Sequence, residues 1–494
     1  MPTLRSLIAC ILSAGVVAAE ESKPLWLAVG NGDMVKPLEP LAEKRRGEGF
    51  DTVVSTESIE KALAMAPRRP EFLLLVGDDE PGRENEPWYL PARRMKLYRW
   101  RAVQREEFAS DAAWGDVDGD LVPEMAVGRI PARTPRQVEL VVEKILEFER
   151  RPPTVDDLQL PIWGGSAEYG PMIDVMATQM LLMMVQAEAP DWAEPWIISG
   201  NPRHPLCGWP PDHPALFNRQ IRRGGALAVL MGHADADSFL SMTFGRQQIW
   251  YTAAAAEAAM SQGPPTPPMV IFSCNSGHFN RPTPCMAEAF FFFPGGPVAT
   301  IAATTESHPL TNYFTSDSLL RGLAESPPRL GTLWLSAQRR AMKMQDFLAE
   351  RVLRDVEGKL EEEIDVEKLR RDQMLMYALL GDPATRLRLP KLLKATVERT
   401  DDAWRWQAER PPGATRLQVG YRSTEKIAVQ WQSGPTGAEK ARADFEAANA
   451  RLGFVPLPSP PEDGPWEGTV DRPGKVRLVA TGGEEVYVAV LELK

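Results

Sequence analysis

The chain has 494 residues, of which 44% are hydrophobic and 25% charged, a composition typical of a soluble globular protein. At roughly 150 residues per domain, this length predicts about three domains. The formal net charge is −11 and no dense Lys/Arg patch is present. Nucleic acid is therefore excluded as a partner, because phosphate binding requires a basic surface.

The first residues have the pattern of an export signal. A short basic start with Arg5 precedes an apolar run at 7–17, and the small residues at 17–19 fit a cleavage site before Glu20. The apolar run is too short to cross a bilayer as a permanent helix, and we find no other transmembrane candidate. We therefore expect residues 1–19 to be a signal peptide and the protein to be secreted, periplasmic or on the cell surface, without stable membrane insertion.

Residues 24–150 are predicted to form a smaller N-terminal α/β subdomain. Strand-like runs occur at 25–29, 71–76 and 123–130. A helix is predicted at 134–150, where apolar residues recur at helical spacing on one face. The Pro-containing stretch 151–154 is the expected linker.

Residues 155–390 alternate between strand and helix patterns. The expected strands are at 160–163, 225–232, 268–273 and 297–303, and the expected helices are at 175–187, 253–261 and 325–380, the last interrupted near 357–358. Such alternation predicts an α/β domain with a mostly parallel sheet flanked by helices.

The sequence pattern changes after residue 390. Short alternating runs at 415–421, 426–432, 475–481 and 485–491 are separated by Gly and Pro turns. This pattern predicts that residues 391–494 form a small antiparallel β-sandwich of the immunoglobulin-like kind.

Two apolar segments of the central domain each end in a reactive side chain. The run at 225–232 ends at His233, and the run at 268–273 ends at Cys274. Parallel strands buried on both faces look like this, and open α/β sheets place their working residues at the carboxyl ends of such strands. A thiol and an imidazole are the two parts of a nucleophilic pair. The sequence therefore predicts cysteine-dependent acyl transfer, with peptide hydrolysis as the leading reaction.

Each of these residues also has a structural interpretation. Cys274 could be a small buried hydrophobe at a strand end, and His233 a hydrogen-bonded structural histidine. His278 and His308 are rival bases.

The cysteines allow further alternatives. Without the signal, Cys207, Cys274 and Cys285 remain, and an odd number indicates an unpaired thiol or a bridge between chains. His204, Cys207 and His213 could suggest zinc, but the prolines between them favour a rigid loop.

An acidic cluster lies in the N-terminal subdomain. Asp116, Asp118, Asp120 and Glu124 have the alternating spacing that hard cations prefer, although the Glu that closes a twelve-residue EF-hand loop is missing. The cluster is either a calcium site or an acidic turn.

With these residues in view, the chain resembles the gingipain family of secreted cysteine peptidases, whose catalytic domain has a caspase-like fold. The resemblance spans roughly residues 70–390, and no single motif is decisive. The matching segments are 73–78 with 116–120 and 127–131, 165–168 (Gly-Ser-Ala-Glu), 231–233 (Met-Gly-His), 274–279 with 285–288 and 295–301, and 380–383 (Leu-Gly-Asp-Pro).

The resemblance implies a role for each site residue. Cys274 would be the nucleophile, His233 the general acid/base, and Glu168 the acidic residue that orients the imidazole, unless Glu168 only caps the following helix. The backbone N–H groups of Ala234 and Cys274 would hold the oxyanion. No cofactor is expected for the chemistry, and structural calcium fits the family.

The resemblance also implies a substrate preference. Asp174 is the nearest equivalent of a carboxylate that selects Arg or Lys before the cleaved bond, although a helix cap is the competing interpretation. The chain departs from the family at Ala234, where a Gly is usual, at Phe239, where Trp is usual, and in the shorter loop after Glu168. A catalytically silent binding protein and a transpeptidase therefore stay open as alternatives.

Overall fold

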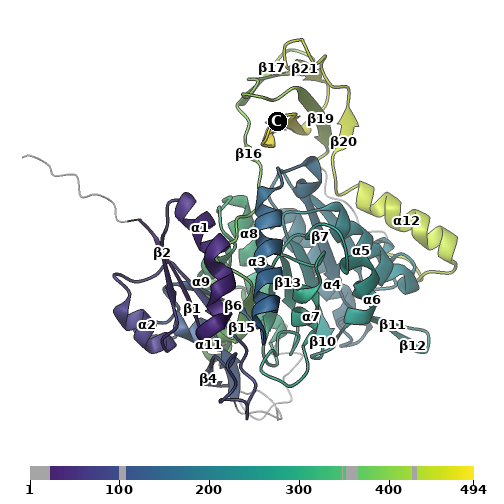
Figure 1. Ribbon diagram of the computed structural model, residues 1–494. Helices are drawn as coiled ribbons and strands as arrows, with labels where there is room; N and C mark the ends of the chain where they lie inside the picture. Colours follow the sequence, from purple (N-terminus) through teal and green to yellow (C-terminus); the bar gives the residue numbers. More distant parts are fainter. Residues whose placement is uncertain (1–22, 99–106, 348, 352–364, 425–430) are drawn as a thin grey trace, which may run out of the picture.

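The computed structural model describes residues 23–98, 107–347, 349–351, 365–424 and 431–494 (Figure 1). Three predictions lie partly or wholly outside these residues. They are the signal peptide at 1–19, most of the strand at 426–432 and the helix interruption near 357–358.

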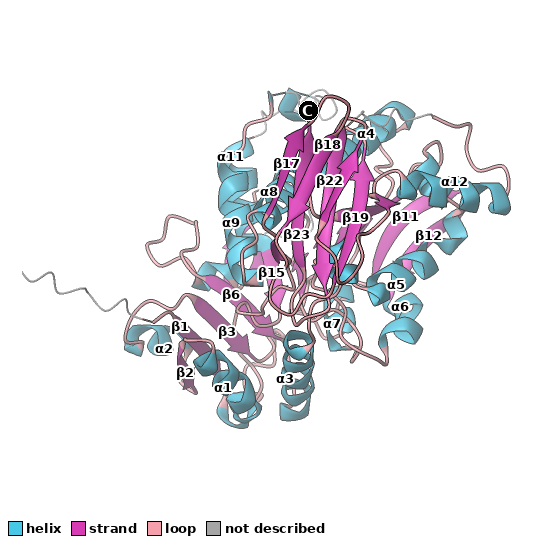
Figure 2. Cartoon of the chain, turned by 90° about the horizontal axis from the view of Figure 1, so that it is seen from above, coloured by secondary structure: helices cyan, strands magenta, loops and turns pink. Residues whose placement is uncertain are grey.

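A ten-stranded, mostly parallel sheet forms the centre of the molecule (Figures 1 and 2). Its strand order is β2 (Asp51–Ser55), β1 (Leu25–Gly30), β3 (Phe72–Val76), β6 (Ala126–Ile130), β15 (Tyr377–Leu380), β14 (Thr300–Ala303), β13 (Met269–Phe272), β9 (Ala228–Met231), β7 (Gln159–Gly164) and β8 (Glu194–Ser199). The segments predicted as two α/β units thus contribute to one sheet. They join at β15, which runs antiparallel to β14 and pairs with β6 only at Leu380 and Arg129.

Helices cover both faces of this sheet, as the caspase-like fold requires. One face packs against α1 (Glu39–Gly47), α3 (Pro135–Arg150), α5 (His213–Arg223), α6 (Ala253–Met260) and α7 (Met286–Phe292). The other packs against α4 (Pro171–Glu188), α8 (Pro309–Ala324), α9 (Leu330–Lys343) and α11 (Val366–Met376), while α2 (Ile59–Met65) covers the outer strands. The central strands are buried on both sides, which explains their uninterrupted apolar sequences.

Local signals explain why one predicted helix is confirmed and another is wrong. The helix predicted at 134–150 is α3, and Thr134 caps it with Gln137 in a capping box. The helix predicted at 325–380 is wrong in two places: α9 ends at Lys343 and is followed by non-helical residues at 344–346, and Tyr377–Leu380 is the buried strand β15. Those four residues suit a helix or a strand equally well, and pairing along β14 favours the strand.

The C-terminal residues form a two-sheet β-sandwich. One sheet contains β16 (Lys391–Leu392), β23 (Tyr487–Leu493), β22 (Gly474–Thr481), β19 (Arg416–Arg422) and β20 (Val455–Leu457), and the other contains β17 (Ala395–Arg399), β18 (Trp404–Ala408) and β21 (Glu467–Val470). Trp406, Trp466 and Leu478 belong to the core between them.

A helix that the sequence pattern did not predict, α12 (Ala438–Ala450), departs from this sandwich. It packs against the central domain, where the Asn449 side chain accepts from the N–H of Ile197 and donates to its carbonyl.

No helix in the described ranges is both long and apolar enough to span a bilayer.

Candidate active site

Neighbouring strands bring His233 and Cys274 together. β9 and β13 pair in parallel up to Met231 and Phe272, and each reactive residue lies two positions further on. Asn275 has φ +57, a left-handed conformation that Asn tolerates, so the chain turns sharply after Cys274. His233 and Cys274 are both partly exposed and line the same cavity of about 260 Å³.

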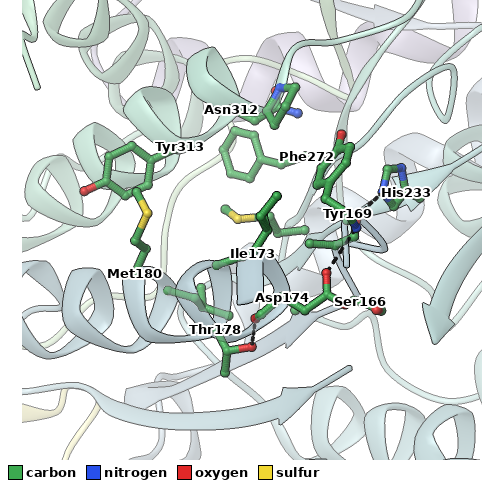
Figure 3. A pocket seen from close by; sticks show the side chains of 18 of the residues that line it. Ser166, Tyr169, Ile173, Asp174, Thr178, Met180, His233, Phe272, Asn312 and Tyr313 are labelled. Carbon is green, nitrogen blue, oxygen red and sulfur yellow. Dashed lines mark hydrogen bonds between the residues drawn. The ribbon is translucent and has the colours of Figure 1, made fainter. Parts of the chain in front are cut away.

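The contacts of His233 define its tautomer. Its Nε2 lies 2.7 Å from the carbonyl oxygen of Ala167. Since a carbonyl only accepts, Nε2 carries the proton and donates it, which leaves the lone pair on Nδ1. The Tyr169 ring packs edge-on against the imidazole, with ring centroids 5.6 Å apart (Figure 3). The imidazole is therefore held with Nδ1 as its basic atom.

The thiol of Cys274 is held by a different carbonyl. Its Sγ donates to the oxygen of Ser307 at 3.5 Å. Burial raises the pKa of Cys274, hydrogen bonding to the sulfur by the backbone and side chain of Ser307 opposes this rise, and the nearby Glu306 charge adds to it. Within the described part of the chain, no hydrogen bond joins the thiol to the imidazole of His233. The raised pKa favours the protonated thiol, so nucleophilic attack by Cys274 requires a base.

The Glu168 carboxylate contacts Thr243 and makes no hydrogen bond with His233 among the described residues. Glu168 has φ +53, and its Oε1 accepts from the hydroxyl of Thr243 at 2.7 Å. The orienting contact to His233 comes instead from the carbonyl of the preceding residue, Ala167. The orienting role of Glu168 thus stays a prediction.

Asp174 lies on α4 and lines the cavity. Its Oδ1 accepts from the backbone N–H of Tyr169 at 3.1 Å. Burial raises the pKa of Asp174, the bond from Tyr169 lowers it, the Glu168 charge raises it, and His233 lowers it. Asp174 therefore lies within electrostatic reach of both Glu168 and His233.

The main-chain N–H groups of the two predicted oxyanion donors, Ala234 and Cys274, are available to donate to a substrate oxygen. Among the residues that the structure describes, the N–H of Cys274 donates no hydrogen bond. Ala234 pairs with Phe239 in the hairpin of β10 (His233–Ala234) and β11 (Ser238–Phe244). The adjacent Asp235 donates its N–H to Ser238, so antiparallel alternation directs the N–H of Ala234 away from β11.

The rival residues have structural contacts. His308 caps α8 by accepting from the N–H of Leu310, and burial lowers the pKa of His308 to about 3. His278 is not among the described residues that line the cavity.

The suggested zinc group is also structural. His213 contacts the hydroxyl of Ser241 and the carbonyl of Cys207 through its two ring nitrogens, and burial lowers the pKa of His213 to about 4. In the described ranges, this group is not among the residue sets whose side chains converge as metal ligands.

The other thiols are also accounted for. Cys207, Cys274 and Cys285 are all free, and Cys207 and Cys285 are buried. Burial raises the pKa of Cys207 to about 12 and also raises that of Cys285. Cys274 is the one accessible thiol among the three described cysteines.

The carboxylates of the acidic cluster converge. One oxygen from each of Asp116, Asp118, Asp120 and Glu124 lies within 4.8 Å of the others. Backbone N–H groups of the same loop also donate to them, from Val117 to Glu124 at 2.7 Å for example. The arrangement has oxygen donors of the kind that calcium binds, and it is also a hydrogen-bonded acidic turn.

Sequence reasoning missed three groups at this site. The carbonyl oxygens of Ala167 and Ser307 have no side-chain signature, so no residue pattern could indicate them. Tyr169 follows the Gly-Ser-Ala-Glu motif directly, and that position was the available signal.

A mostly parallel sheet with Cys and His at the ends of two neighbouring strands defines the class of caspase-like cysteine peptidases. The sequence profile of Peptidase family C25 matches residues 20–388. The chain therefore belongs to Peptidase family C25, which confirms the gingipain-like resemblance and identifies the protein as a cysteine-type peptidase with protein or peptide substrates.

Solved structures agree with this fold. A structure titled "Structure of Protease" matches at 14% identity with a TM-score of 0.55, over 95% of this chain and 97% of that one. The Arg-specific cysteine proteinase gingipain R matches at 13% identity and a TM-score of 0.52, over 96% and 99% of the two chains. The complex of the Porphyromonas gingivalis RgpB pro- and mature domains matches at 13% and 0.51, over 95% and 100%. No curated protein sequence matches the chain.

Proposed function

We propose that the protein is an exported cysteine endopeptidase in which Cys274 and His233 hydrolyse peptide bonds through a thioester. The observation that carries this proposal is that both residues follow neighbouring strands and line one cavity, with the imidazole held so that Nδ1 is the base. Fold alone does not establish activity, so the proposal depends on this geometry.

The first half-reaction forms the thioester. The Sγ proton of Cys274 passes to Nδ1 of His233, which requires the thiol to leave the Ser307 carbonyl, and the sulfur attacks the scissile carbonyl carbon. The N–H groups of Ala234 and Cys274 stabilise the negative oxygen of the tetrahedral intermediate. Collapse breaks the C–N bond, and the imidazolium returns its proton to the leaving amine.

The second half-reaction regenerates the enzyme. Water gives a proton to Nδ1 of His233 while its oxygen attacks the thioester carbonyl. The C–S bond breaks, the acid product leaves, and the sulfur of Cys274 recovers the proton. The Ala167 carbonyl keeps Nε2 protonated throughout, and we assign to Glu168, the next residue along the chain, the stabilisation of the imidazolium by its negative charge. No cofactor takes part in these steps.

Cleavage of a pooled fluorogenic peptide library by residues 20–494 tests the proposal. Cys274→Ala is the inactive comparison, and Cys207→Ala is the matched control because Cys207 is buried. We expect the parent and Cys207→Ala to cleave peptides and to react with an acyl-mimicking thiol electrophile, and Cys274→Ala to do neither. Absence of both activities in the parent would favour a silent binding protein, and predominant acyl transfer to an added amine would favour a transpeptidase.

The resemblance implies a preference for Arg or Lys on the acyl side of the cleaved bond, which the same library tests separately from the peptidase function. It depends on Asp174, whose carboxylate lines the cavity near His233. Asp174→Asn should then lower cleavage after Arg and Lys in the same library.

Export is supported by the basic, apolar and small-residue segments at the start of the chain. Expression of the full chain with fractionation should place the protein outside the cytoplasm, with Glu20 as its first residue. Retention of Met1 in the cytoplasmic fraction would contradict export.

We further propose that the converging carboxylates of the acidic cluster bind structural calcium. Added Ca²⁺ should raise the melting temperature of the parent, and a chelator should reverse the rise. Asp118→Asn should reduce the effect, while Asp402→Asn, an exposed control in the C-terminal domain, should not. An equal response in all three proteins would contradict specific binding.

A further inference from the structure

The cavity beside Cys274 has mostly apolar walls. Its side chains come largely from two helices, with Ile173, Met176, Ala177 and Met180 on α4 and Leu310 and Tyr313 on α8 (Figure 3). The hydroxyl of Tyr313 is bonded to Asp346 at 3.5 Å, so the aromatic ring is the part of Tyr313 left for the cavity. A side chain entering this space therefore meets carbon and sulfur atoms on most sides.

The spacing of residues on α4 produces this wall. Ile173, Ala177 and Met180 recur every three to four residues and so share one face of the helix. Met183, on another face, is 64% exposed and is not among the lining residues. α4 thus has a methionine in the cavity wall, Met180, and another outside it, Met183.

The cavity lies directly beside the reacting atoms. Phe272 on β13 is two residues before Cys274, and both line it together with His233. A peptide whose scissile carbonyl lies at Sγ therefore has its acyl-side residue, the one that contributes this carbonyl, at the entrance. The side chain of this residue is the part of the substrate closest to the cavity.

The polar groups of the cavity mostly bind one another. Asn201 donates to the hydroxyl of Thr178 at 3.2 Å, and that hydroxyl donates to the backbone oxygen of Asp174 at 2.8 Å. The Asp174 carboxylate accepts from the N–H of Tyr169. An entering guanidinium would find a single carboxylate, that of Asp174, among the residues that line the cavity, and it would otherwise lose water against apolar walls.

We propose that this cavity is the specificity pocket and takes a large apolar acyl-side residue such as Leu, Met or Phe. This assignment rests on the proposed peptidase function and differs from the Arg or Lys preference implied by the resemblance. The size is sufficient, because an apolar cavity of roughly 150 Å³ holds benzene and this one has about 260 Å³.

Peptide amides of a fluorogenic amine that differ only in the acyl-side residue test the preference. We expect kcat/KM for Leu, Met or Phe to exceed that for Arg, Lys and Ala by roughly tenfold or more, because an apolar pocket discriminates on buried surface. A preference for Arg or Lys in the parent would overturn the proposal while leaving the peptidase function intact.

Matched variants of α4 test whether the cavity wall determines the preference for the acyl-side residue. Met180→Glu places a charge in the wall and should lower the ratio of Phe to Arg cleavage by roughly tenfold or more, whereas Met183→Glu adds the same charge outside and should leave it unchanged. Equal ratios in both glutamate variants would overturn the assignment.

A binding measurement tests the pocket assignment independently of catalysis. Cys274→Ala should bind a dye-labelled peptide ending in Phe amide at least about tenfold more tightly than the same peptide ending in Arg amide. Adding Met180→Glu should remove this difference. If the parent cleaves no peptide but this difference is found, the proposed function fails and the pocket assignment holds; equal binding, or tighter binding of Arg, overturns the pocket assignment.

Discussion

The two halves of the central sheet differ in the environment of their charged and reactive side chains. On and after β3 and β6, buried carboxylates are held in ion pairs, with 2.6 Å between Asp78 and the partly exposed Arg133 and 2.6 Å between Asp111 and the buried Arg129. After β9 and β13, His233 and Cys274 stay partly exposed, and each bonds a single backbone carbonyl.

The two regions nevertheless lie close together. The Arg133 guanidinium also donates to the carbonyl of Arg281, on the loop that follows Cys274. The contrast shows which polar residues are available for chemistry. Removing one member of a buried ion pair destabilises the fold, because the other charge is left without its partner. A partly exposed thiol and imidazole with one hydrogen bond each can instead exchange protons with a substrate.

Replacing His233 tests the reactive region most directly. His233→Gln should lower kcat/KM by roughly 10²- to 10⁴-fold, because general acid/base transfer through Nδ1 is lost. Its unfolding midpoint in urea should match that of the parent, since the residue is partly exposed and its Nε2 bond is to one carbonyl. Activity within tenfold of the parent would show that another group is the base.

Breaking a buried ion pair should affect the other region through stability alone. Asp111→Ala leaves the fully buried Arg129 guanidinium unpaired, and the free energy of unfolding should fall by about 3–5 kcal/mol. Activity per folded molecule should stay at the parental level. Glu139→Ala, which breaks the exposed pair with Arg136, is the control and should leave urea unfolding unchanged.

The pH dependence of stability should reveal a buried carboxyl next to the ion-paired region. Burial raises the pKa of Glu288 to about 8, and the Asp78 charge adds to the rise. The folded state therefore keeps a proton that the unfolded state loses above about pH 4.5, so this group lowers stability as the pH rises towards 8.

Glu288→Gln cannot ionise but keeps an acceptor for the N–H of Cys285. It should be more stable than the parent at pH 9, by up to about 5 kcal/mol if the full shift from 4.5 to about 8 is realised, and should show little difference at pH 5. Urea unfolding at both pH values measures the effect. A loss of stability that is equal at both would show that Glu288 is already ionised in the folded protein.

The smallest expected effect concerns Glu168. Glu168→Gln should lower kcat/KM by less than about tenfold, since the Ala167 carbonyl already fixes the imidazole tautomer. Thr243→Val, which removes the donor to that carboxylate, is the companion variant. A loss of a hundredfold or more in Glu168→Gln alone would establish the carboxylate as the orienting group.

Much of the fold followed from local sequence signals. The apolar runs that became β1, β3, β7 and β13 are long enough and apolar enough to be read as buried strands. The segment at 377–380 was misread because a short apolar run after a helix has no periodicity of its own, and only pairing with β14 decides its state. The helix α12 was missed in a stretch interpreted through the alternating runs around it.

For the site, the sequence by itself determined which side chains could react. An isolated Cys and His, each at the end of a strand-like run, indicated both the chemistry and the sheet edge that holds it. Only the tertiary structure decided the rest. The carbonyls of Ala167 and Ser307 and the apolar wall formed by α4 and α8 depend on contacts between distant segments. Backbone atoms are the same in every residue, and the shape of a cavity belongs to the packing of helices, so neither leaves a pattern that sequence alone reveals.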